Sequence, residues 1–234
     1  MTQKIIAQGA EAIIYLVSPL SKKSSSLINS KRRNLAKPVS KQSISSEASE
    51  FIIKDRIKKS YRIPELDDKI RKQRTKAEKK LLEKASKIIN APDPFPLKEF
   101  NKIEMPYLNG KKLSDNLDSF PLKKQKQILR QIGKDTAKLH DANIIHGDLT
   151  TSNMILVEDK IFFIDFGLGF ISHKFEDKAV DVHLLKQALE AKHFKNWKIL
   201  YQEFVKGYKS TNKEQAEKTL NQMIKVEKRG RYKS

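Results

Sequence analysis

The chain has 234 residues, a hydrophobic fraction of 38% and no cysteine. This length allows one large domain or two small lobes around a shared cleft, and the lack of cysteine excludes disulfides, thiolate nucleophiles and cysteine zinc sites. The formal net charge of +20 favours contact with nucleic acid or with an acidic partner surface. Because the sequence has no run of about 18 apolar residues and no signal-peptide pattern, we expect no membrane contact, and the lack of cysteine fits a cytoplasmic protein.

The amino-terminal part is typical of short strands. Two apolar, β-branched runs within residues 3–17 flank a glycine and predict a hairpin with Gly9 at its tip. Residues 18–50 contain eleven serines, seven lysines or arginines and no aromatic residue. We expect a flexible basic insertion there, because so little apolar surface cannot offset the entropy of ordering. The apolar run at residues 51–54 then predicts another strand.

A helix is expected over residues 65–90, where apolar residues and alanines recur at helical spacing before a proline-rich segment. Short strands are expected at residues 97–100 and 102–107, and Asn109-Gly110 marks a turn.

The rest of the chain is predicted to be mostly helical. Residues 121–141 carry apolar positions at helical spacing and predict an amphipathic helix. The expected inward positions are Ile128, Leu129, Ile132, Thr136 and Leu139. Strands are expected at 153–157 and 161–165. These elements predict an α+β fold of two lobes, a small β-rich N-terminal lobe at residues 1–104 and a reduced, mostly helical C-terminal lobe at residues 105–234.

Two motifs carry the candidate chemistry. Residues 146–153, His-Gly-Asp-Leu-Thr-Thr-Ser-Asn, have the form H-x-D-x-x-x-x-N, and an apolar strand separates them from Asp-Phe-Gly at residues 165–167. Phosphoryl transfer needs a carboxylate that orients and deprotonates the attacking hydroxyl, and hard oxygen ligands for Mg²⁺. We predict Asp148 as catalytic base and Asn153 and Asp165 as metal ligands. Either motif alone could cap turns or helices, but together they favour a protein-kinase-like fold that uses ATP and Mg²⁺.

The amino-terminal half supplies candidates for phosphate binding. Lys54 ends an apolar strand and Glu78 lies on the next predicted helix, as in the ion pair of protein kinases. A solvated helix glutamate is the alternative for Glu78. Gly9 would form the turn that covers the phosphates, although only one glycine of the G-x-G-x-x-G pattern is present and a plain hairpin tip is the alternative.

Together these residues resemble the small kinases of the KEOPS complex, the PRPK-type family related to the RIO kinases. The resemblance lies in Gly9 to Ala12, Lys54 to Asp67, Arg74 to Glu78, His146 to Asn153, Asp165 to Gly169, Lys178 to Asp181 and Arg229 to Lys233. It implies a cytosolic Ser/Thr-type kinase or ATPase that helps to make threonylcarbamoyl-adenosine in tRNA. The implied partners are an ATPase-fold tRNA-modifying subunit, a small regulatory subunit and tRNA.

The resemblance also implies an ATP site and its support. The expected ATP contacts are Gly9, Ala10, Lys54, Glu78, Met105, Tyr107 and Leu108. Pro106 has no N–H to donate, so adenine would use the carbonyl of Met105 or Pro106 and the amide of Tyr107 or Leu108. The expected supporting residues are His146, Gly167 and Asp181. Asp181 either caps the helix that it begins or holds the backbone of the catalytic loop.

The sequence departs from ordinary protein kinases in ways that narrow the substrate. Gly147 replaces the arginine that grips a phosphorylated activation loop, and Thr150 replaces a lysine beside the γ-phosphate. About ten residues separate Gly167 from the helix expected at Lys178, and no A-P-E motif follows. We therefore expect ATP hydrolysis, autophosphorylation or phosphorylation of a docked partner instead of broad peptide phosphorylation.

The carboxyl-terminal segment is basic and is a candidate for tRNA contact, with a frayed, solvated terminus as the alternative. Its candidate residues are Lys228, Arg229, Arg231 and Lys233. Two other functions stay open from the sequence. One is a largely non-catalytic tRNA-binding adaptor with structural ATP. The other is a small-molecule phosphotransferase, which also uses the H-G-D-x-x-x-x-N pattern.

Overall fold

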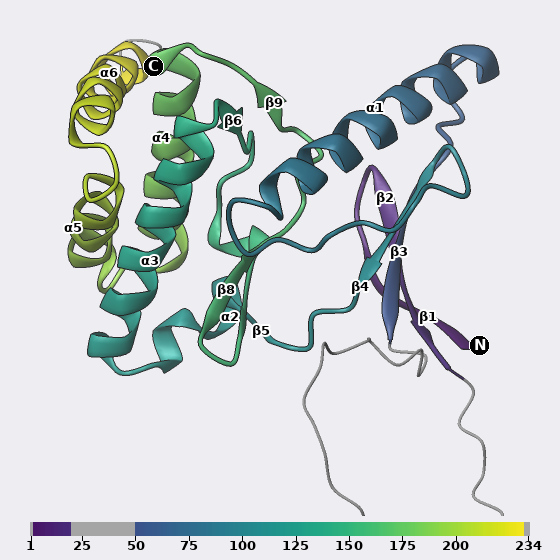
Figure 1. Ribbon diagram of the computed structural model, residues 1–234, viewed down its shortest axis with the longest axis horizontal. Coiled ribbons are helices and arrows are strands. Elements are labelled where there is room, and N and C mark those ends of the chain that lie inside the picture. Colours follow the sequence, from purple (N-terminus) through teal and green to yellow (C-terminus); the bar gives the residue numbers. More distant parts are fainter. Residues whose placement is uncertain (1, 20–49, 232–234) are drawn as a thin grey trace, which may run out of the picture.

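The computed structural model describes residues 2–19 and 50–231, with side chains as far as residue 229. It has the predicted α+β architecture, in which a four-stranded sheet precedes a mostly helical part (Figure 1). The basic insertion predicted at residues 18–50 lies almost entirely outside the described residues. Within the described ranges, no helix combines the length and the apolar character that crossing a membrane requires.

The amino-terminal sheet positions one lysine and one arginine side by side. Its strands, in spatial order, are β1 (Thr2–Gln8), β2 (Ala12–Ser18), β3 (Phe51–Arg56) and β4 (Lys102–Pro106), and all neighbours are antiparallel. The predicted hairpin is confirmed, because the Gly9 amide donates to the Ala12 carbonyl at 2.9 Å between β1 and β2. Side chains alternate along a strand, so Lys54 and Arg56 lie buried on the same face of β3.

Helix α1 (Pro64–Ala85) lies beside this sheet, and its carboxyl end reaches the helical part of the molecule (Figure 1). Pro64 occupies the first helical position, where its missing N–H costs nothing. The helix ends earlier than the predicted residue 90. The Ala85 carbonyl accepts from the amides of both Ile88 and Ile89 at 2.9 Å, which tightens the chain into a turn, and the Asn90 carbonyl then accepts from the Phe163 amide at 3.0 Å.

The strand predicted at residues 97–100 is wrong. These residues form a bend and a turn, because the chain reverses direction between Phe95 and β4. The Phe95 amide donates to the Glu104 carbonyl at 2.8 Å, and the Arg56 amide donates to the Asn101 carbonyl at 3.0 Å. These two bonds leave residues 97–100 as the tip of the reversal.

The helical part is built on four long helices, which lie together on the left of Figure 1. They are α3 (Leu122–Asp141), α4 (Phe175–Lys192), α5 (Trp197–Tyr208) and α6 (Lys213–Arg231). Helix α3 confirms the predicted amphipathic helix, and all five predicted inward positions are buried. Short elements connect the helices: β5 (Lys111–Lys112), α2 (Leu113–Asn116), η1 (Leu117–Ser119), β6 (Ile144–Ile145), η2 (Thr151–Asn153), β7 (Met154–Val157), β8 (Lys160–Phe163) and β9 (Phe170–Ile171).

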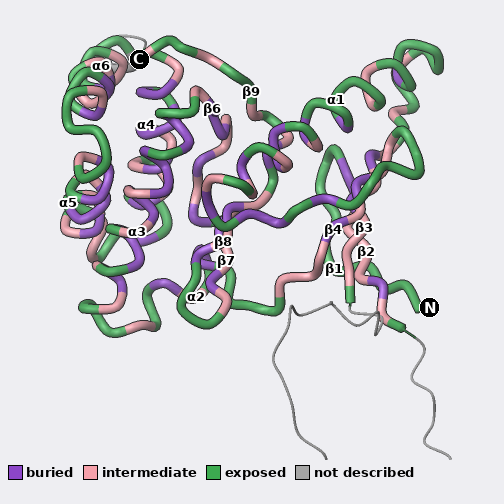
Figure 2. Tube along the Cα trace, in the orientation of Figure 1, coloured by how far each residue is buried: buried purple, intermediate pink, exposed green. Residues whose placement is uncertain are grey.

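Buried residues are distributed unequally between the amino-terminal sheet and the helical part. Figure 2 shows buried residues concentrated in the helical part and along one side of α1. Strand β1 is exposed throughout, as the outer strand of the sheet. Strands β7 and β8 match the strands predicted at 153–157 and 161–165, but β8 ends at Phe163, so Asp165 follows the strand instead of ending it.

Helices α3 and α5 cross in direct backbone contact because each carries a glycine at the crossing. A Cβ atom added at Gly133 would lie 2.1 Å from the Phe204 carbonyl oxygen, and one added at Gly207 would lie 1.9 Å from the Arg130 carbonyl oxygen. Neither position has room for a side chain. The crossing brings Phe204 and Tyr208 into the hydrophobic core.

We predict that Gly207→Ala lowers the free energy of unfolding by about 1–3 kcal/mol, because the new methyl group must displace the backbone of α3. Helix propensity alone would instead predict a gain of up to about 1 kcal/mol. Urea unfolding shows whether the free energy of unfolding falls or rises. Gln127→Ala, at an exposed position of α3, is the control and should change stability by less than about 0.5 kcal/mol. A more stable Gly207→Ala protein would contradict the close crossing.

Candidate active site

Two adjoining cavities, of about 410 and about 420 Å³, lie between the sheet and the helical part. Ala7, Ile14, Lys54 and Asp165 line both of them. The first is mainly apolar and runs from the sheet to the segment after β4. The second is lined by the turn between β1 and β2, including Gly9 and Ala10, and by charged side chains. An apolar compartment joined to a charged one suits a nucleotide, whose base and phosphates have these two characters.

Four charged side chains meet where the two cavities join. Lys54 Nζ lies 2.7 Å from Glu78 Oε1 and 2.7 Å from Asp165 Oδ1. Arg56 Nη2 lies 2.5 Å from the second Glu78 oxygen. The structure therefore forms the predicted Lys54–Glu78 pair, and with side chains 9% and 1% exposed it is nearly closed to water.

The pKa shifts follow from this arrangement. Burial alone would lower the pKa of Lys54, but the charges of Glu78 and Asp165 raise it above its ordinary value. Burial alone would raise the pKa of Asp165, but the charge and hydrogen bond of Lys54 lower it. Lys54 and Asp165 are thus held in their charged forms near neutral pH.

The catalytic loop brings Asp148 and Asn153 together. The Asn153 Nδ2 group donates to Asp148 Oδ2 at 2.8 Å and to the Asp148 carbonyl at 2.9 Å. With its nitrogen turned to Asp148, the Asn153 side chain leaves its oxygen available in the apolar cavity that it lines. Asp148 itself lines the charged cavity.

The donor set fits a magnesium ion held jointly by protein and phosphates. Asp165 uses Oδ1 for Lys54 and for the Gly167 amide at 3.1 Å, which leaves Oδ2 as a carboxylate ligand. Within the part of the chain that the structure describes, no group of three or more histidine, aspartate or glutamate side chains could hold a metal without other ligands. Magnesium in phosphoryl-transfer sites needs only one or two protein oxygens beside water and phosphate.

The Asp181 side chain holds the backbone of the catalytic loop in place. It accepts hydrogen bonds from the His146 amide at 2.7 Å and from the Gly147 amide at 2.9 Å. His140 Nε2 lies 3.3 Å from Asp181, and Tyr208 OH lies 2.7 Å from His140 Nδ1. The capping alternative is wrong, because α4 begins at Phe175 and Asp181 lies inside it. Burial alone would raise the pKa of Asp181, but the hydrogen bonds and charges of its partners lower it.

His146 and Gly147 fix the loop against the segment that follows Asp165. The buried His146 ring contacts the Ile164 carbonyl at 3.1 Å, and its centroid lies 4.6 Å from that of Phe166. Gly147 has φ +80°, and an added Cβ would lie 2.2 Å from the Leu168 carbonyl oxygen. A side chain at Gly147 would be strained and would clash, so the arginine of ordinary kinases cannot occupy this backbone. Gly167 is also crowded, since an added Cβ would lie 2.9 Å from Asp165 Oδ1.

The hydrogen bonds around β4 decide between the alternatives for adenine. The Tyr107 amide donates to the Glu50 carbonyl at 3.2 Å, so the prediction that this amide binds adenine is wrong. The Glu104 carbonyl faces the opposite edge, where the Phe95 amide donates to it. Carbonyl groups of residues two apart on a strand face the same edge. The Pro106 carbonyl, two residues after Glu104, therefore faces that edge as well. Pro106 and Leu108 line the apolar cavity, so the carbonyl of Pro106 and the amide of Leu108 are the available pair.

Sequence reasoning missed three residues of this region. Arg56 shares Glu78 with Lys54, and the signal was its place two residues after Lys54 on one strand. Arg74 lines the charged cavity and pairs with Glu11 at 2.7 Å, between α1 and the turn after β1. His140 connects Tyr208 to Asp181. Nothing in the local sequence indicates the partners of Arg74 or His140, because those partners are distant along the chain.

The predicted basic tail is helical as far as Arg231, the last residue of α6. Lys228 is exposed there, and Arg229 pairs with Glu176 at 2.7 Å. The side chain of Arg231, and Lys233 as a whole, lie outside the described residues.

Comparison with known proteins agrees with this geometry. A family model described as the RIO domain matches residues 39–179. The KEOPS complex subunit Bud32 of Pyrococcus abyssi is 43% identical over 77% of this chain and 84% of its own length. A probable serine/threonine-protein kinase BUD32 homolog of Archaeoglobus fulgidus is 38% identical over 77% and 88%. A probable bifunctional tRNA threonylcarbamoyladenosine biosynthesis protein of Methanococcus maripaludis is 41% identical over 78% of this chain, which spans 33% of that protein.

We predict that Asp181→Asn lowers the free energy of unfolding by about 1–3 kcal/mol at pH 7, because an amide cannot accept from both loop amides and from His140. The folded pKa of Asp181 lies below its ordinary value of 3.8. The stabilising effect of its charge is therefore complete above that value and is lost as the pH falls through the lower folded pKa.

Urea unfolding of both proteins from pH 7 into the acid range checks this, and the difference between them should shrink below pH 3.8. Asp159→Asn, at an exposed position where the carboxylate pairs with Lys124, is the control for a surface ion pair and should change stability by less than about 1 kcal/mol. Equal stability of wild type and Asp181→Asn at pH 7 would contradict the role given to Asp181.

Proposed function

The chain belongs to the RIO domain family, and from this premise and the geometry of the cleft we propose that it is an ATP- and Mg²⁺-dependent phosphotransferase or ATPase that acts in tRNA modification. One observation carries the proposal. Asp148, Asn153, Asp165 and the Lys54–Glu78 pair come from separate elements and converge on two adjoining cavities of the size and character that a nucleotide needs.

In the proposed mechanism the adenine enters the apolar cavity between Ile52 and Ile155. Its amino group donates to the Pro106 carbonyl, and its neighbouring ring nitrogen accepts from the Leu108 amide. The phosphates lie under the turn at Gly9 in the charged cavity. Nothing in the fold requires glycine at this turn, since an added Cβ would meet only the Ala12 carbonyl at 3.9 Å. Close approach of the phosphates is a sufficient reason for it.

The charged residues then act on the phosphates and on the attacking group. Lys54, held by Glu78, binds phosphate oxygens, and Asn153 and Asp165 supply the protein oxygens for Mg²⁺. When bound by Asn153 and Asp165, Mg²⁺ would neutralise the charge that develops on the phosphates. Asp148 orients the attacking hydroxyl or water and accepts its proton. The hydrogen bond from Asn153 keeps the Asp148 carboxylate in place.

The acceptor is proposed to be water or a residue of a docked partner. The catalytic loop packs directly on Leu168 through Gly147, and α4 begins at Phe175, so the segment between them is short. This leaves little chain with which to form a groove for free peptides. Leu168, Phe170 and Ile171 are 65%, 44% and 46% exposed beside the catalytic loop, and exposed apolar groups of this kind favour a protein partner.

The names of the relatives suggest what that partner is. We propose that the chain works in the cytoplasm with KEOPS subunits, namely an ATPase-fold tRNA-modifying subunit and a small regulatory subunit, because the similar protein of Pyrococcus abyssi is a KEOPS complex subunit. The name of the Methanococcus maripaludis relative says that it is probably bifunctional, and this chain spans only 33% of it, which supports work beside a second activity. A largely non-catalytic tRNA-binding adaptor is the second candidate, and the net charge of +20 favours it.

We predict that Asp148→Asn and Asp165→Asn each reduce ATP turnover by at least about 100-fold, because one removes the base and the other a charged metal ligand. Single-turnover hydrolysis, with the partner subunits and tRNA present, is the measurement. Asp159→Asn is the control for the loss of one surface charge. Unchanged turnover in both variants would refute the site and would support the adaptor.

We also predict that ATP binds at least about tenfold more tightly than GTP. Guanine reverses the donor and acceptor pattern of adenine at the relevant edge, so it would leave the Pro106 carbonyl and the Leu108 amide without partners. Competition between the two nucleotides for the wild-type chain measures the ratio. Equal affinities would contradict the assignment of these two backbone groups.

A further inference from the structure

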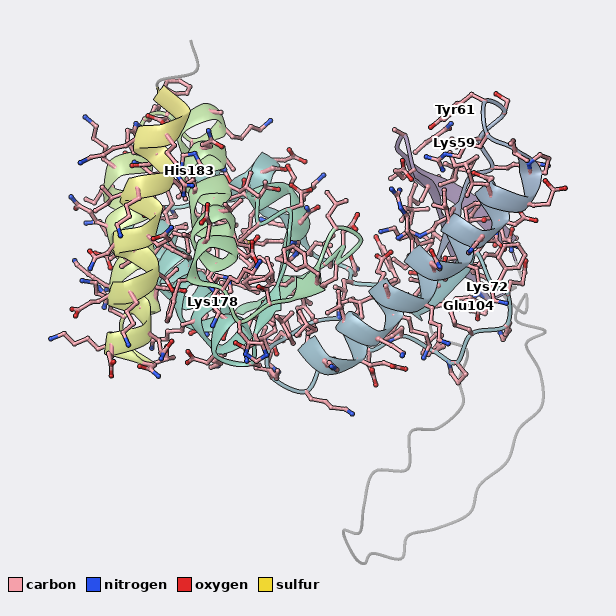
Figure 3. All side chains as sticks on the ribbon, turned by 90° about the horizontal axis from the view of Figure 1, so that it is seen from above. Lys59, Tyr61, Lys72, Glu104, Lys178 and His183 are labelled. Atoms are coloured by element: carbon pink, nitrogen blue, oxygen red, sulfur yellow. The ribbon has the colours of Figure 1, made fainter. Side chains whose placement is uncertain are left out.

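The outward face of α1 carries a row of lysines. Lys69, Lys72, Lys76, Lys80 and Lys84 are all exposed. At 100° per residue they lie within about 120° of one another around the helix, and at 1.5 Å per residue they extend over about 22 Å. We call these five residues the lysine row. Figure 3 shows α1 and its side chains from above, with Lys72 labelled.

The lysine row has no ion-pair partner among the residues that the structure describes, although Glu65 and Glu83 fall within the same arc of the helix. None of its five members forms an ion pair or a side-chain hydrogen bond there, whereas most other charged side chains of α1 do. Asp67 is shared by Arg62 and Arg71, and Glu83 pairs with Lys79.

The lysine row also opposes the stability of its own helix. Lys72, Lys76, Lys80 and Lys84 follow one another at the i,i+4 spacing at which like charges destabilise a helix. A helix that needed charge only for solubility would gain from glutamate at alternate positions. The spacing instead suits an external anion with many charges in a line.

A nucleic-acid backbone fits this face better than an acidic protein does. Interfaces between proteins are enriched in aromatic residues and arginine and are depleted in lysine. The exposed residues between the lysines, Gln73 and Ala77, offer no apolar anchor. Lysine acts as a point charge without the planar fork that reads base edges, so a row of lysines contacts phosphates independently of sequence.

We propose that the lysine row is a binding surface for the phosphate backbone of RNA. This inference rests on the proposed function in tRNA modification and adds a surface distinct from the carboxyl-terminal residues. Helix α1 also carries Glu78 on its opposite, buried face. RNA bound along the outside of α1 would therefore stabilise the element that holds Lys54 in the active site.

The test compares two triple variants of the full chain with equal loss of charge. Lys72→Gln, Lys76→Gln and Lys80→Gln together alter the lysine row. Lys123→Gln, Lys192→Gln and Lys195→Gln together alter three exposed lysines of the helical part that form no ion pair among the described residues. Binding of an unmodified tRNA transcript is measured at several salt concentrations, and ATP turnover without RNA is measured alongside.

We expect the lysine-row variant to bind tRNA about tenfold or more weakly at 0.1 M salt, and its salt slope to fall by about two to three, as expected for the loss of three phosphate contacts. The control variant should change affinity less than about twofold, and both should keep wild-type ATP turnover. Equal weakening in the two variants, or none in either, would overturn the proposal. So would unchanged tRNA binding with lost binding to polyglutamate, which would indicate an acidic protein. Because tRNA binding is measured without catalysis, failure here is distinct from failure of the Asp148 test.

Discussion

The contact of buried Lys54 with buried Glu78 and with the half-exposed Asp165 is the interaction on which the rest of the site depends. It joins β3, α1 and the segment after β8, three elements that share no local sequence. The charges of Lys54, Glu78 and Arg56 would each be costly to bury alone. Their mutual pairing makes the cleft possible and brings the amino-terminal sheet to the catalytic loop.

A second set of buried contacts fixes the other side of the cleft. Tyr208, His140 and Asp181 form a chain of polar groups from α5 through α3 to α4, and Asp181 then holds the catalytic-loop backbone. The glycine-mediated crossing of α3 and α5 positions Tyr208 in this chain. Gly147 allows the catalytic loop to contact Leu168 directly. The packing that orders Asp148 therefore also occupies the short segment where ordinary kinases bind peptides.

The sequence was sufficient for the fold class and for the positions of the main chemical groups, because strand and helix periodicity and the two motifs are local signals. It was insufficient wherever contacts between residues distant in the sequence determine the local conformation or the hydrogen-bond partner. The amide of Tyr107 is engaged by Glu50, residues 97–100 form a turn because Phe95 bonds to Glu104, and Asp181 lies inside α4. Arg56 was missed because its partner, Glu78, is fixed only by the packing of α1 on the sheet.

The most direct measurement is a crystal structure of the chain with Mg²⁺ and a non-hydrolysable ATP analogue. The account predicts magnesium between the phosphates, the Asn153 side-chain oxygen and the Asp165 carboxylate, with Lys54 on the phosphates, still paired to Glu78. A nucleotide bound elsewhere would contradict it, as would a metal ion that neither Asn153 nor Asp165 contacts.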